Sequence, residues 1–121
     1  MPVSAIPGFV AATDRALADA LPGVRLVTYG HVGDSNLHYD LSGPVGGDDG
    51  DFRARAAVLS RIVYDSTAAS DGSISAEHGL GQAERDVVAD YESGLELELM
   101  RGVKRLFDPA GLMNPGKVRP G

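Results

Sequence analysis

The sequence predicts an α+β fold in which a small antiparallel sheet is flanked by helices. Residues 24–31 and 37–42 are rich in β-branched and aromatic residues, and a Gly-Asp-Ser-Asn turn between them indicates a hairpin. Longer segments with apolar residues at helical spacing make up most of the remaining sequence. A two-stranded hairpin is marginally stable alone, so we expect it to pack on these helices or to extend a larger sheet.

The first half of the chain divides into clear elements. A helix is expected over residues 7–20, with Pro7 in its first turn, and Leu-Pro-Gly ends it. In the turn of the hairpin, Gly33 is expected to take a positive φ, while Asp34 and Asn36 are expected to bond to nearby backbone.

The second half is predicted to be mainly helical. An acidic loop leads into a helix over residues 52–69, and residues 73–76 are a candidate third strand. A short helix is expected over 82–90 and a longer one over 92–107, which Asp108-Pro109 ends. The longer helix has one apolar face, formed by Leu95, Leu99, Val103, Leu106 and Phe107.

Composition excludes several classes of function. The net charge is −6 and no basic cluster is present, which argues against binding to nucleic acid or anionic membrane. Cysteine is absent, which fits a reducing compartment. No apolar run approaches the roughly 20 residues that span a bilayer, and the N-terminus lacks signal-peptide features. We therefore expect a cytoplasmic protein without membrane insertion.

All three histidines lie beside glycine-containing turns, and Glu77 adjoins the third. Two imidazoles and a carboxylate suit zinc or another divalent first-row ion. His31 and His38 can share an ion if they are opposed on one face of the hairpin, where Cβ atoms lie about 5 Å apart. The alternative is that both simply flank a turn, and spacing alone favours it.

Two further residues are candidates for chemistry. His78 is suited to act as a general base, because histidine titrates near neutral pH and Gly79 permits a bend toward a site. A surface histidine in a loop is the alternative. Asn114, in Met-Asn-Pro-Gly-Lys, can meet an anionic or heterocyclic ligand, although the pattern by itself favours a simple turn.

Three ordered stretches together point to a family. They are GHVGDSNLHYDL at 30–41, GSISAEHGLGQAERD at 72–86 and LMRGVKRLFDPAGLMNPGKV at 99–118. Across residues 24–118 the chain resembles the C-terminal part of the FAD-linked oxidases that act on D-2-hydroxy acids, such as D-lactate and D-2-hydroxyglutarate dehydrogenases and the FAD subunit of glycolate oxidase. The resemblance implies a cap domain that carries the substrate site beside a separate FAD-binding domain.

The resemblance also implies roles for individual residues. His31, His38 and Glu77 match the ligands of a divalent metal, zinc by our expectation, and His78 matches the base that takes the hydroxyl proton. Asn36 matches a position near substrate and flavin, and Asn114 a tail residue near the flavin ring. The implied substrate is a small 2-hydroxy acid, oxidised with FAD as the hydride acceptor.

The chain departs from the family in two respects. Ser35 stands where the family often has glycine, which adds about 1 kcal/mol if that residue takes a positive φ. No flavin-binding domain fits within 121 residues. We therefore expect residues 1–121 to be a C-terminal portion of an FAD-linked oxidase, inactive alone and prone to self-association through exposed apolar surface.

Two other functions are compatible with the same residues. One is a free-standing metal-binding or interaction module without redox activity. The other is a small zinc hydrolase, for which no nucleophile or oxyanion constellation accompanies the histidines.

Overall fold

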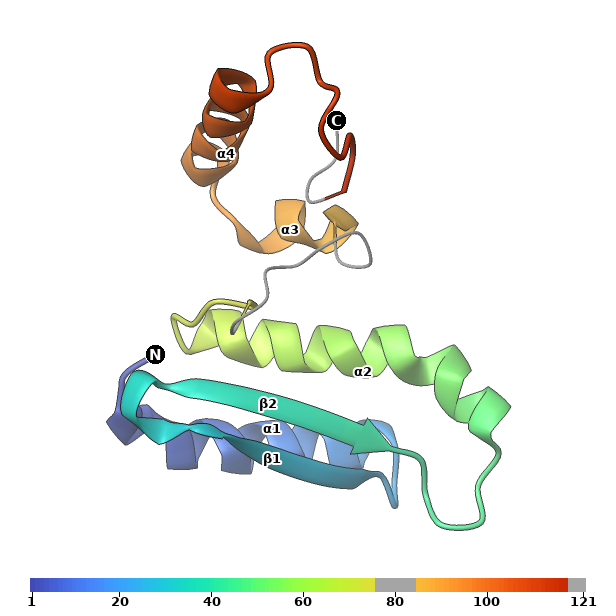
Figure 1. The fold of residues 1–121 in the computed structure, drawn as a ribbon. Helices are drawn as coiled ribbons and strands as arrows, with labels where there is room; N and C mark the ends of the chain where they lie inside the picture. Colours follow the sequence, from blue (N-terminus) through green and yellow to red (C-terminus); the bar gives the residue numbers. More distant parts are fainter. Residues whose placement is uncertain (76–84, 118–121) are drawn as a thin grey trace. The chain divides into compact units, whose positions relative to one another are not determined.

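The computed structural model describes residues 1–75 and 85–117, which belong to two compact units (Figure 1). The first unit, Met1–Ala76, contains a β-hairpin and two long helices, and the second, Glu77–Gly121, contains two helices and a tail. The predicted α+β class is confirmed.

The hairpin consists of strands β1 (Arg25–His31) and β2 (Asn36–Ser42). The 3-10 turn η2 (Val32–Asp34) connects them. The strands pair antiparallel, and the register runs from the pair Arg25↔Ser42 to the pair at the turn, His31↔Asn36. In the described part of the chain the sheet contains these two strands.

Two helices cover one face of the hairpin. The 3-10 turn η1 (Val3–Ala5) leads into α1 (Ile6–Ala20), and α2 (Asp49–Ala69) packs against α1. Side chains alternate across a strand, so every second residue of the hairpin faces these helices. The core that results consists of buried Leu17, Leu21 and Leu59, with Leu26, Tyr39 and Leu41 of the hairpin packed against them.

Tyr39 links the inner face of the hairpin to α1. Its hydroxyl donates to Oδ1 of Asp14 over 3.1 Å, and its ring meets Phe9 edge-on with the centroids 5.9 Å apart. Burial, with a further contribution from the nearby Asp14 carboxylate, raises the pKa of Tyr39 to about 12. The phenol therefore remains a donor at neutral pH and holds the inner face against the helix.

Two predictions about elements of the first unit were wrong. Helix α2 begins at Asp49 rather than at residue 52, because the side chain of Asp48 caps it by accepting the Gly50 N–H over 2.8 Å. Residues 73–75 form no strand, since Oγ of Ser73 accepts the N–H of Ser75 over 3.2 Å and turns the chain. Residue 76 lies outside the described residues.

The second unit contains α3 (Arg85–Tyr91) and α4 (Gly94–Phe107), so both predicted helices are present, but α4 begins two residues later than the predicted residue 92. A reciprocal capping box starts α4: Ser93 accepts the Glu96 N–H over 3.2 Å, and Glu96 accepts the Ser93 N–H over 2.7 Å. The predicted apolar face of α4 is present, and its five side chains are 58% to 77% exposed. Within the described ranges, no helix is long and apolar enough to cross a membrane.

We predict that Leu59→Ala lowers the free energy of unfolding by about 2–5 kcal/mol, because the substitution leaves a cavity beside α1. Leu59 is 3% exposed, whereas its neighbour Val58 on α2 is 61% exposed. Val58→Ala is therefore the matched control and should change stability by at most about 0.5 kcal/mol. Urea denaturation followed by circular dichroism measures both values. Equal losses in the two variants would contradict this assignment of the core.

Candidate functional site

Three of the predicted site residues lie on one face of the hairpin. The register pairs His31 with Asn36 and Tyr29 with His38. Because side chains alternate, these four residues share the face opposite the inner residues Leu26 and Tyr39, which pack toward the helices. The His31 side chain is 68% exposed, whereas Asn36 and His38 are half-buried.

His31 and His38 are diagonal neighbours, so the directly opposed arrangement considered for a shared ion is not the one formed. Direct opposition would need all six residues 32–37 to be unpaired, but only residues 32–35 separate the strands and the pair at the turn is His31↔Asn36. Diagonal neighbours lie about 7–8 Å apart, still within reach of long side chains. Both side chains therefore lie on the outer face, offset along the strands.

The turn is closed by short-range hydrogen bonds. The N–H of Ser35 donates to the carbonyl of Val32 over 3.2 Å, and Oδ1 of Asp34 accepts the Asn36 N–H over 3.3 Å. The latter confirms the predicted role of Asp34. The positive φ predicted for Gly33 instead belongs to Ser35, with φ 61°. That residue occupies the position where the family often has glycine, at a cost of about 1 kcal/mol.

Gly30 is a structural requirement that the sequence analysis missed. A Cβ at this position would lie 2.0 Å from the carbonyl oxygen of Asn36, and its φ is 156°. A glycine inside a strand run often marks such a close approach of two backbones, and this was the available signal. The close contact allows His31 and Asn36 to pair at the end of the hairpin.

Two contacts restrain the histidine rings. The ring of His38 stacks on Tyr29, with centroids 5.1 Å apart and planes inclined by 17°. Nδ1 of His31 lies 3.9 Å from Oδ2 of Asp34 across the turn. The stacking limits the rotation of the His38 ring and thus the directions in which its nitrogens point.

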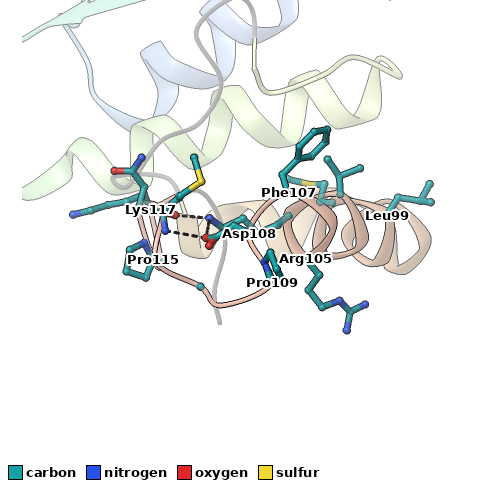
Figure 2. A pocket seen from close by; sticks show the side chains of 14 residues that line it. Leu99, Arg105, Phe107, Asp108, Pro109, Pro115 and Lys117 are labelled. Carbon is teal, nitrogen blue, oxygen red and sulfur yellow. Dashed lines mark hydrogen bonds and ion pairs between the residues drawn. The ribbon is translucent and has the colours of Figure 1, made fainter.

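The second unit contains a pocket of about 850 Å³ between α4 and the tail (Figure 2). Leu99, Val103 and Phe107 of α4 contribute apolar lining. The tail contributes Asn114, the predicted flavin-facing residue, which has a left-handed backbone with φ 46°. An apolar pocket with a few polar groups is typical of a site for an organic ligand.

Asp108 joins α4 to the tail. Its carboxylate is almost fully buried and accepts the N–H groups of Leu112 and Met113, each over 2.9 Å. Lys104 donates to this carboxylate and to the carbonyl of Met113. Sequence analysis identified Asp108 only as part of the signal that ends the helix.

These donors control the protonation of Asp108. The hydrogen bond from Lys104, followed by that from the Met113 N–H, lowers the pKa of Asp108 to about 2. An unfolded aspartate titrates near about 3.9. The ionised carboxylate therefore stabilises the folded tail above about pH 4, and this contribution is lost as the pH falls through about 2.

The remaining predicted residues, Glu77 and His78, lie outside the described residues. Among residues 1–75 and 85–117, no group of three or more His, Asp and Glu side chains is placed to hold a metal ion. The two imidazoles of the hairpin nevertheless suit a divalent ion that accepts nitrogen ligands. They are two of the three predicted donors, and the third, Glu77, falls in the segment that is not described.

Comparison with known proteins decides the family. The profile of the family described as "FAD linked oxidases, C-terminal domain" matches residues 1–118. The chain belongs to this family.

Curated relatives of this FAD-linked oxidase domain are dehydrogenases of 2-hydroxy acids. D-2-hydroxyglutarate dehydrogenase of Stutzerimonas stutzeri is 38% identical over 96% of this chain and 25% of its own length. The Xanthomonas citri enzyme of the same name is 40% identical over the same shares. D-lactate dehydrogenase of Anaerostipes hadrus is 35% identical over 98% of this chain and 24% of its own length. The chain thus spans about a quarter of these relatives.

We predict that Gly30→Ala disrupts the end of the hairpin in this FAD-linked oxidase domain, because its Cβ would clash with the Asn36 carbonyl. The loss of stability should exceed about 1 kcal/mol. Gly33→Ala is the matched control, since nothing lies within 4 Å of a Cβ there. Thermal unfolding and the cross-strand NMR contacts between His31 and Asn36 measure the effect. Intact contacts in the Gly30→Ala variant would contradict the register.

Proposed function

We propose that this chain is the substrate- and metal-binding C-terminal part of an FAD-dependent dehydrogenase that oxidises a D-2-hydroxy acid to the 2-oxo acid. The observation that carries the proposal is the outer face of the hairpin, on which His31, Asn36 and His38 lie together in a member of the FAD-linked oxidases. The relatives named for D-2-hydroxyglutarate and D-lactate support the substrate class, because both compounds carry a hydroxyl beside a carboxylate.

The metal site of the proposal consists of His31 and His38 with Glu77 as the third donor. Two imidazoles and one carboxylate form a donor set that suits zinc and leaves a position open for substrate oxygen. A bound divalent ion supplies Lewis-acid stabilisation of the oxygen that loses its proton. The stack on Tyr29 supports this site, since it restrains the ring of His38 before any ligand arrives.

In the proposed reaction, His78 is the general base. The O–H bond of the substrate breaks and its proton goes to His78, while the Cα–H electron pair leaves as hydride and a C=O bond forms. FAD supplies the hydride acceptor. Asn36 orients the substrate from the hairpin, and Asn114 approaches the flavin from the tail.

The binding partners of the proposal follow from the same assignment. FAD is bound mainly by a separate domain beyond these 121 residues, and the chain contributes the tail and the hairpin face. The exposed apolar face of α4 supports self-association of the isolated chain, which stays a prediction, as does the cytoplasmic location.

A chimera tests this function. The matching segment of the Stutzerimonas stutzeri enzyme is replaced by this chain, and the purified protein is mixed anaerobically with D-2-hydroxyglutarate or D-lactate. We predict loss of the visible absorbance of the bound flavin with at least one of them. His78→Ala should slow this reduction by about 100-fold or more, because it removes the general base, and should leave the FAD content unchanged.

Val58→Ala serves as the exposed control and should reduce its flavin at the unaltered rate. A chimera that binds FAD but is reduced by neither acid would contradict the substrate class. Normal reduction in the His78→Ala protein would contradict the role of the base.

A further inference from the structure

The junction between α4 and the tail is held by side chains rather than by helix geometry alone. Asp108 is 7% exposed and accepts two backbone N–H groups of the tail, those of Leu112 and Met113. Lys104 lies one helical turn earlier and donates both to Asp108 and to the Met113 carbonyl. These four hydrogen bonds hold the tail as far as Met113, the residue directly before Asn114.

Capping of α4 does not explain this arrangement. The N–H of Asp108 already bonds to the Lys104 carbonyl over 2.9 Å, as a helix end requires. A carboxylate at the C-terminus of a helix interacts unfavourably with the helix dipole, so stabilisation of the helix end does not account for Asp108. Both oxygens accept from tail amides, and Lys104 offsets the charge. Figure 2 shows Asp108 between α4 and the returning tail.

These four hydrogen bonds form a clamp, made by Asp108 and Lys104, that also constrains the backbone that follows. Asn114 adopts the left-handed φ of 46°, which asparagine tolerates better than most residues. Charge-assisted hydrogen bonds are about twice as strong as neutral ones, so the carboxylate and the ammonium give the tail a defined course. Asn114 thereby becomes part of the pocket lining beside Val103 and Phe107.

We propose that Asp108 and Lys104 are positioning residues, which hold the tail so that Asn114 meets the flavin at the pocket. This inference rests on the proposed function, because Asn114 meets a flavin only if the chain is part of an FAD-dependent enzyme. It assigns no contact between Asp108 and the substrate, so the pair acts through the tail alone.

The first arm of the test uses the chain itself. Asp108→Asn removes the charge that holds the two tail amides, so hydrogen exchange at Leu112 and Met113 should accelerate about tenfold or more. The amide of Leu97, bonded to Ser93 at the start of α4, should keep its rate. Glu98→Gln is the matched control, because it removes one charge from an exposed position on the same helix. Unchanged exchange at Leu112 and Met113 would overturn the clamp.

The second arm measures flavin reduction in the chimera. Asp108→Asn and Lys104→Met should lower kcat about tenfold while KM changes little, because the flavin contact is disturbed and the substrate face is not. Lys104→Arg should retain most of kcat, since a guanidinium can donate to both acceptors. Faster hydrogen exchange at Leu112 and Met113 together with an unchanged kcat would overturn the positioning role. If the unaltered chimera is not reduced, the proposed function fails, and the exchange rates still decide the clamp.

Discussion

The pairing of His31 with Asn36 across a four-residue turn is the constraint on which the hairpin depends. It is possible only because residue 30 has no Cβ to clash with the Asn36 carbonyl. Since side chains alternate, this one pair determines which residues face α1 and α2 and which face outward. A slip of one residue would turn the polar set toward the helices and Tyr39 away from Asp14. The packing of the core and the outward-facing position of His38 thus have a single cause.

Much of the fold could be predicted from local patterns. Helical spacing and β-branched runs located the two strands and the helices α1, α2, α3 and α4, because each is specified by its own residues. The errors fell where a side chain bonds to nearby backbone. Asp48 starts α2 three residues early, and Ser73 turns a segment considered as a strand. Such bonds compete with regular structure, and composition alone does not show which one forms.

The geometry of the hairpin residues could not be predicted from the sequence. The sequence places His31 and His38 on either side of one turn, yet their diagonal relation depends on that turn, in which Ser35 rather than Gly33 is left-handed. The stack of Tyr29 on His38 and the tail bonds of Asp108 join residues whose proximity no periodicity predicts. Helical spacing likewise predicted the apolar face of α4, but it did not predict that the side chains of this face are exposed.

Titration of the chain with Zn²⁺, followed by the NMR signals of its imidazoles, tests most directly whether the outer face of the hairpin binds metal. We predict that the signals of His31 and His38 shift along one common saturation curve, because both rings lie on the same face of the sheet. His31→Ala should then weaken the response of His38, while the inner-face residue Tyr39 stays unperturbed. Independent curves for the two histidines, or an unaltered response of His38 in the His31→Ala variant, would contradict a shared site.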